Sequence, residues 1–143
     1  MKLSSNDFKH NEMMDSKYTC DGADVSPHLK WEDAPDTAQS FAISCNDPDA
    51  PIGDWIHWYV CDIPAEVREI PQGGPIPGIE VQNDFRKTSY GGPCPPSGTH
   101  RYFFRVYAID IETLEGINKK NFKDKVNQHT IASAEMIGLY KRR

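Results

Sequence analysis

Three segments of the chain have the β-branched and aromatic content and the length of strands, namely residues 40–46, 56–63 and 101–110. The third alternates between two sets of positions, and both sets are largely apolar: Tyr102, Phe104, Val106 and Ala108 on one side, and Phe103, Arg105, Tyr107 and Ile109 on the other. Because neighbouring side chains of a strand point to opposite faces, we expect this strand to be covered on both faces.

The same alternation in the second segment predicts which way its side chains point. It places His57 and Tyr59 on one face, and Ile56, Trp58 and Val60 on the other. His57 is therefore expected to lie on a strand beside the core.

The best helix candidate is the segment 118–128, where Ile117, Phe122 and Val126 can share one face while lysines and asparagines cover the rest. The final apolar segment, 131–140, fits two structures. Its alanine and methionine residues favour a helix, whereas its glycine and its terminal aromatic residue favour a closing strand. We favour the strand.

Proline and glycine interrupt the chain and limit its fold class. Of the 11 prolines and 10 glycines, 15 lie in residues 48–53, 71–78 and 91–98, where long helices cannot run. Short strands between such turns predict a mainly β protein, an antiparallel, Greek-key-like β-sandwich with one or two short helices. With 143 residues and no Gly/Ser-rich linker, residues 1–143 are expected to form a single domain.

Composition and charge narrow the classes of function. Charged residues make up 26% of the chain, and its apolar runs are only a few residues long, so no membrane span is expected. The first residues turn polar at once and lack the pattern of a secretory signal, which predicts a cytoplasmic protein. The net charge of −5 argues against nucleic-acid binding, which depends on clustered Lys and Arg.

The four cysteines are Cys20, Cys45, Cys61 and Cys94. Without an export signal they are expected to remain thiols rather than form disulfides. Cys45 and Cys61 stand in apolar strand-like runs, where a free cysteine acts as a small hydrophobe. The role of Cys94, among prolines, is left open.

The first polar cluster follows a predicted strand and reads Asn-Asp-Pro-Asp-Ala-Pro from residue 46, with His57 at the start of the next strand. The prolines fix φ and make this loop stiff. The carboxylates of Asp47 and Asp49 are therefore held in few conformations, which suits a preorganised site. The alternative is a simple turn in which both carboxylates cap nearby amides.

The second cluster, residues 90–102, runs from a Gly/Pro-rich loop into the third strand and places His100 at the entrance of that strand. Glycines let a ligand approach the backbone closely, where an amide hydrogen can point at an anion. A histidine adds one donor when neutral and two when protonated. A single histidine of this kind is more often a structural side chain whose hydrogen bonds are made within the protein. Two histidines, each at the start of a strand, favour a phosphate-sized site.

The two clusters carry a resemblance to a known family. The sequence DPDAP followed by DWIHWYV, and then GGPCPPSGTHRY, is similar to the two signature regions of the phosphatidylethanolamine-binding protein family. The flanking segments 18–31 and 129–140 resemble its compact bacterial and archaeal branch, so the resemblance covers nearly the whole chain.

The resemblance implies a β-sandwich with a small pocket for anionic, headgroup-like ligands at one end. The matching ligand-binding positions are Asp47, Asp49, His57, Gly92, Pro93, His100 and Tyr102. Arg101 also matches, but alternation places it opposite His100 and Tyr102, so we expect a structural pair with a carboxylate such as Asp49. The family also implies links to phospholipids, kinase pathways and serine proteases, and assembly into a homodimer.

Three functions are compared. We favour a binding or regulatory protein without catalytic residues, metal or cofactor. The alternative is a metal-assisted hydrolase that uses the Asp and His residues of the two clusters, although no HExxH or GxSxG motif occurs. In a third reading the stiff, proline-rich loop 71–77 inserts into a serine protease as a rigid inhibitor.

Overall fold

The structure is a computed structural model that describes residues 1–142. The described residues form a mainly β fold with one α-helix, which confirms the predicted fold class. The strands are β1 (Lys2–Ser4), β2 (Glu12–Met13), β3 (Leu29–Glu32), β4 (Ser40–Asp47), β5 (Trp55–Pro64), β6 (Glu69–Ile70), β7 (Ile79–Val81), β8 (His100–Ile109) and β9 (Thr130–Tyr140); the helix is α1 (Phe122–His129), and a short 3₁₀ helix, η1, spans Ser16–Tyr18.

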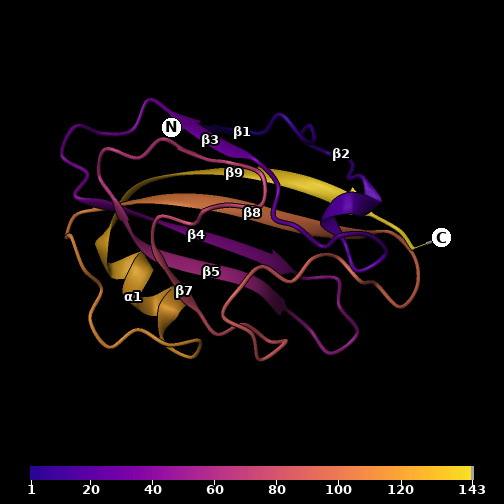
Figure 1. Cartoon of the computed structure of the whole chain (residues 1–143). Helices are drawn as coiled ribbons and strands as arrows, with labels where there is room; N and C mark the ends of the chain where they lie inside the picture. Colours follow the sequence, from indigo (N-terminus) through magenta and orange to yellow (C-terminus); the bar gives the residue numbers. More distant parts are fainter. Residues whose placement is uncertain (143) are drawn as a thin grey trace.

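Two sheets pack against each other. The larger has the order β2-β9-β8-β4-β5-β7 and is antiparallel except where β2 pairs with β9, and the smaller has the order β1-β3-β6. Figure 1 shows β9, β8, β4 and β5 side by side, with β1 and β3 at one side of the molecule. Leu29 and Trp31 of the small sheet share one apolar core with Phe41, Phe104 and Val106 of the large sheet.

The opposite face of the large sheet is covered in part by α1. Phe122 and Val126 pack there against Tyr59 and Ile109, and the rings of Tyr59 and Phe122 stack with their centroids 3.8 Å apart. The helix therefore supplies the second core layer that this half of the sheet needs.

The predicted strands agree with the structure to within about one residue at each end, and the segment 131–140 is a strand, as favoured. The helix prediction was wrong at its start, because α1 begins at Phe122 rather than Asn118. The Asn118 side chain accepts hydrogen bonds from the backbone amides of Lys120 and Asn121, which closes a turn in place of the first helical residues.

The prediction that the third strand is covered on both faces holds only in part. Tyr102, Phe104 and Val106 are buried, but on the opposite face Phe103 and Tyr107 are half-buried, and only Ile109 at the end of that row is fully buried. Phe103 is shielded by the guanidinium groups of Arg101 and Arg105, which lie 5.4 and 5.0 Å from its ring centroid.

In the described part of the chain, the helical segments are too short and too polar to span a bilayer.

Candidate functional site

The loops that join β4 to β5 and that lead into β8 meet at one end of the large sheet and enclose a cavity of about 240 Å³. Four of the seven predicted ligand-binding residues line it, and three do not. The lining residues are Asp47, Ala50, Pro51, Ile52, Trp55, His57, Phe85, Cys94, Pro95, Pro96, His100 and Tyr102. Asp49, Gly92 and Pro93 are therefore beside the cavity rather than in its wall.

A β-bulge turns His57 into this cavity. Cys45 of β4 pairs with Trp58 and Asn46 pairs with Ile56, so His57 is the extra residue that has no partner opposite it. The ring lies edge-on to Tyr102, with the centroids 5.2 Å apart. The predicted face was therefore wrong: His57 lies with the cavity, while Tyr59 packs against the helix on the other face.

The His57 ring is buried and held at one nitrogen. Its side chain is only 3% exposed, and Nδ1 lies 2.6 Å from the carbonyl oxygen of Gly91. Burial lowers the pKa of His57 below its usual value, even though the carbonyl of Gly91 and the carboxylate of Asp47 act in the opposite direction. The ring is therefore neutral near pH 7.

His100, at the first position of β8, is held by Asp47, at the last position of β4. The distance from His100 Nδ1 to Asp47 Oδ2 is 2.7 Å, and both residues are buried. The other carboxylate oxygen of Asp47 accepts a hydrogen bond of 2.7 Å from the backbone amide of Asp49. Asp47 thus fixes both the ring of His100, through its Nδ1, and the start of the loop.

Tyr102 forms part of the cavity wall next to both histidines. Its hydroxyl group is fully buried and has no hydrogen-bond partner among the described residues. Burial raises the pKa of Tyr102, and the nearby carboxylate of Asp47 raises it further, so the group stays protonated. It is a buried donor that makes no hydrogen bond of normal geometry and interacts electrostatically with the carboxylate of Asp47.

Asp49 forms the structural pair that was predicted with Arg101. Two guanidinium nitrogens of Arg101 lie 2.9 and 2.8 Å from the two carboxylate oxygens of Asp49. The bond to Arg101 holds the pKa of Asp49 below its usual range. The pair ties the loop after β4 to the first residues of β8.

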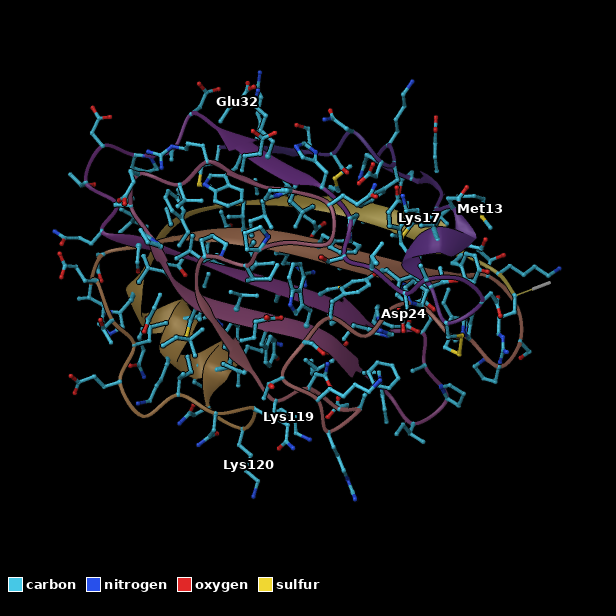
Figure 2. The ribbon with its side chains drawn as sticks, viewed as in Figure 1. Met13, Lys17, Asp24, Glu32, Lys119 and Lys120 are labelled. Atoms are coloured by element: carbon cyan, nitrogen blue, oxygen red, sulfur yellow. A yellow bond between two sulfur atoms is a disulfide. The ribbon has the colours of Figure 1, made fainter. Side chains whose placement is uncertain are left out.

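Gly92 and Pro93 position the second loop against the segment that follows η1. The amide of Gly92 donates to Asp24 Oδ1 at 2.8 Å, and the carbonyl of Pro93 accepts from the amide of Cys20 at 3.1 Å. Figure 2 labels Asp24 among the loops at this end of the molecule. The two residues therefore act here as supports of the cavity wall.

Cys20 and Cys94 form a disulfide between these two loops, so the expectation that all four cysteines are thiols was wrong. They are 74 residues apart in sequence, and contacts between the two segments, such as those of Gly92 and Pro93 with residues 20–24, bring them together. Cys45 and Cys61 are free and buried, as expected. Burial raises the pKa of both thiols, that of Cys61 to about 12, so they remain unreactive hydrophobes.

Sequence reasoning missed the aromatic wall of the cavity. Phe85 lies edge-on to His57 and to Trp55, with centroid distances of 5.1 and 5.5 Å. Its position depends on Asn83, a fully buried residue whose side chain bonds four backbone groups, those of His57, Phe85, Lys87 and Ser89. No motif or apolar pattern in that segment could have indicated this role.

The side chains of the site show no ready-made metal centre. In residues 1–142, no group of three or more His, Cys, Asp or Glu side chains is arranged to hold a metal ion. The metal-assisted alternative thus has no ligand set among these residues.

Comparison with known proteins places the chain among a set of close relatives. A family model described as "Phosphatidylethanolamine-binding protein" matches residues 4–141. A UPF0098 protein of Aquifex aeolicus is 46% identical over 99% of this chain and 89% of its own length, and the UPF0098 protein YbhB of Escherichia coli is 39% identical over 98% and 99%. The crystal structure of E. coli YbcL, described as a new member of the mammalian PEBP family, has a TM-score of 0.93 at 31% identity, covering 99% of this chain and 98% of that one.

Proposed function

The chain belongs to the phosphatidylethanolamine-binding protein family, and from this premise we propose that its cavity binds a small ligand through an anionic group such as a phosphate or a carboxylate. Membership supports a binding or regulatory role in general. The class of ligand follows from the size and the lining of the cavity.

The cavity has the size and lining of a site for a headgroup rather than for a large ligand. Its volume of about 240 Å³ is below the roughly 300–1,000 Å³ typical of sites for drug-sized molecules. Trp55, Phe85 and Pro95 form apolar walls, whereas the polar groups are few and gathered on Asp47 and the two histidines, beside Tyr102. Such a combination buries a small ligand and orients it through a few hydrogen bonds.

The pairing of His100 with Asp47 in the cavity wall is the observation that carries the proposal. Asp47 occupies Nδ1 of His100, so Nε2 is the ring nitrogen that would serve a ligand in the cavity. When the ring is protonated, its Nε2 donates to an anionic oxygen. Tyr102 packs beside the ring in the cavity wall, but its hydroxyl is fully buried and has no exposed surface for a ligand to contact.

We also propose protein partners, on the basis of family resemblance alone. The candidate partners are a kinase, a serine protease and a second copy of the chain. The loop 71–77, considered above as a protease-binding segment, is held to the body of the protein by hydrogen bonds from Gly73 to Ser26 and from Gln72 to Tyr18. These hydrogen bonds fit a rigid protease-binding loop, and they fit an ordinary structural turn equally well.

The anion site is tested by calorimetric or NMR titration with phosphoethanolamine and inorganic phosphate. We expect saturable binding at millimolar or lower concentration, and we expect His100→Ala to weaken it about tenfold or more, because a charge-assisted hydrogen bond is lost.

The matched control is His129→Ala, since His129 is also paired with an aspartate but lies at the end of α1, outside the cavity. It should bind like the wild type. Absence of binding at tens of millimolar ligand, or equal binding by His100→Ala, would contradict the proposal.

A further inference from the structure

The Cys20–Cys94 disulfide joins a well-anchored segment to the cavity wall. On the Cys20 side, the backbone amide of Cys20 donates to the carbonyl of Pro93 at 3.1 Å. The hydroxyl of Tyr140, in β9, donates to the carboxylate of the next residue, Asp21, at 2.6 Å. Hydrogen bonds to the rest of the fold therefore hold this side of the disulfide.

The other side of the disulfide lacks such bonds. Residues 94–99, which we call the wall segment, form no backbone hydrogen bonds to other described residues. Pro95 and Pro96 have no amide hydrogen to donate. The wall segment is tied at its end by His100, the first residue of β8, and at its start by the disulfide. The disulfide thus supplies a restraint that hydrogen bonds supply on the Cys20 side.

The wall segment combines a stiff part with a flexible one. Cys94, Pro95 and Pro96 line the cavity, and the two proline rings fix the backbone there. Gly98 follows with a φ of +71°, and a Cβ atom built on it meets nothing within 4 Å, so the space around it is open. A rotation at Gly98 would therefore carry both prolines away from the cavity together.

The disulfide can be reached from solvent. Cys20 is exposed and Cys94 is half-buried, and an accessible disulfide is open to attack by thiols. The free thiols of Cys45 and Cys61 are buried, and burial raises the pKa of both. They are therefore poor partners for exchange, and an added dithiol would act on the Cys20–Cys94 bond.

We propose that this disulfide is a redox switch of the cavity, and that its reduction by a dithiol frees the wall segment and weakens ligand binding. This inference rests on the proposed function. One thiolate of the dithiol attacks Sγ of Cys20 and expels the Cys94 thiolate, and the second thiol then attacks the mixed disulfide. The dithiol becomes a cyclic disulfide, and its two electrons and two protons pass to the cysteines, which end as thiols. The freed wall segment then has more conformations to lose when a ligand binds.

The switch is tested by phosphate titration of the oxidised and the reduced protein at one pH. Dithiothreitol is a suitable reductant because it is uncharged and does not compete as an anion. We expect the reduced protein to bind inorganic phosphate at least about fivefold more weakly, because the wall segment must be ordered at the expense of affinity.

Ligand binding and reduction must also be coupled in the reverse direction. Saturating phosphate should raise the ratio of reduced to oxidised dithiothreitol that half-reduces the protein, by the same factor by which reduction weakens binding. Thiol trapping and mass spectrometry measure that ratio. Sodium chloride at the same ionic strength is the control and should leave the ratio unchanged.

A variant without the disulfide gives the reduced state permanently. The double variant Cys20→Ser, Cys94→Ser should bind phosphate like the reduced wild type and should not respond to dithiothreitol. Cys61→Ala, which changes a buried free thiol, should keep the wild-type response. NMR spectra verify that each protein is folded. In the reduced wild type, the amides of Ser97 and Gly98 should show lower order parameters, while that of Asp21 should not.

The possible failures can be told apart. Phosphate affinities within about twofold in the two redox states, or tighter binding by the reduced protein, would overturn the switch and leave the proposed function in place. Unchanged order parameters of the wall segment on reduction would show that other contacts hold it, which would also overturn the switch. Absence of phosphate binding in both states would overturn the proposed function and the switch with it.

Discussion

Two buried tyrosines near the cavity differ in what their hydroxyl groups contact. Tyr90 donates to the backbone carbonyl of Tyr18 at 2.8 Å, whereas the hydroxyl of Tyr102 has no partner in residues 1–142. The same chemical group thus forms a hydrogen bond within the fold at one position and forms none of normal geometry at the other.

Removing each hydroxyl should therefore have different consequences. Tyr90→Phe leaves the buried Tyr18 carbonyl unpaired and is expected to lower the free energy of unfolding by about 1–3 kcal/mol. Tyr102→Phe removes a hydroxyl that makes no hydrogen bond of normal geometry, so it should change that free energy by less than about 1 kcal/mol. Denaturant unfolding of both variants measures the two effects.

A stability loss in Tyr102→Phe as large as that in Tyr90→Phe would show that the Tyr102 hydroxyl is bonded within the free protein.

At the scale of elements, sequence patterns predicted the strands well because each is a run of β-branched and aromatic residues between prolines and glycines. They failed for His57, because a bulge breaks the alternation by one residue and depends on pairing with β4. The positions of Phe85 and of the Cys20–Cys94 bond also depend on contacts between segments far apart in the chain. Local patterns contain no signal for such contacts.

The loop before β8 and the segment after η1 pack so closely at Gly92 that no side chain fits between them. A Cβ atom at Gly92 would overlap with the carbonyl oxygen of Tyr18 and the carboxylate of Asp24, and would lie 2.9 Å from Thr19 Cα. Gly92 is therefore needed for the close approach of two backbones.

Gly92→Ala is expected to lower the free energy of unfolding by about 2–3 kcal/mol, because backbone atoms must move. Gly98→Ala is the control within the same loop. A Cβ at Gly98 meets nothing within 4 Å, and the left-handed φ of +71° there should cost only about 1 kcal/mol. Denaturant unfolding compares the two, and equal losses would contradict this account of the packing.

At the scale of the whole molecule, the Cys20–Cys94 disulfide links the N-terminal segment to the cavity wall. Beyond it, the backbone amides and carbonyls of residues 95–99 form no hydrogen bonds to other described residues before β8 begins. The disulfide is thus a main restraint on this part of the wall.

Reduction of this bond should lower the free energy of unfolding by about 2–4 kcal/mol, because the unfolded chain loses a loop of 74 residues. Denaturant unfolding with and without a phosphine reductant measures the change. The double variant Cys20→Ser, Cys94→Ser should match the reduced protein and should not respond to the reductant. A wild-type curve that the reductant leaves in place would contradict the expectation.

The bond also changes the covalent topology of the molecule. From residue 20 to residue 94 the chain is a closed ring, and the segments before and after it are two tails. Asp47 and His57 belong to the ring, whereas His100 and Tyr102 belong to the C-terminal tail, so both parts contribute residues to the cavity wall. A peptide bond cut in any loop of the ring would open it without releasing a fragment, and both halves of the cavity would remain part of one molecule.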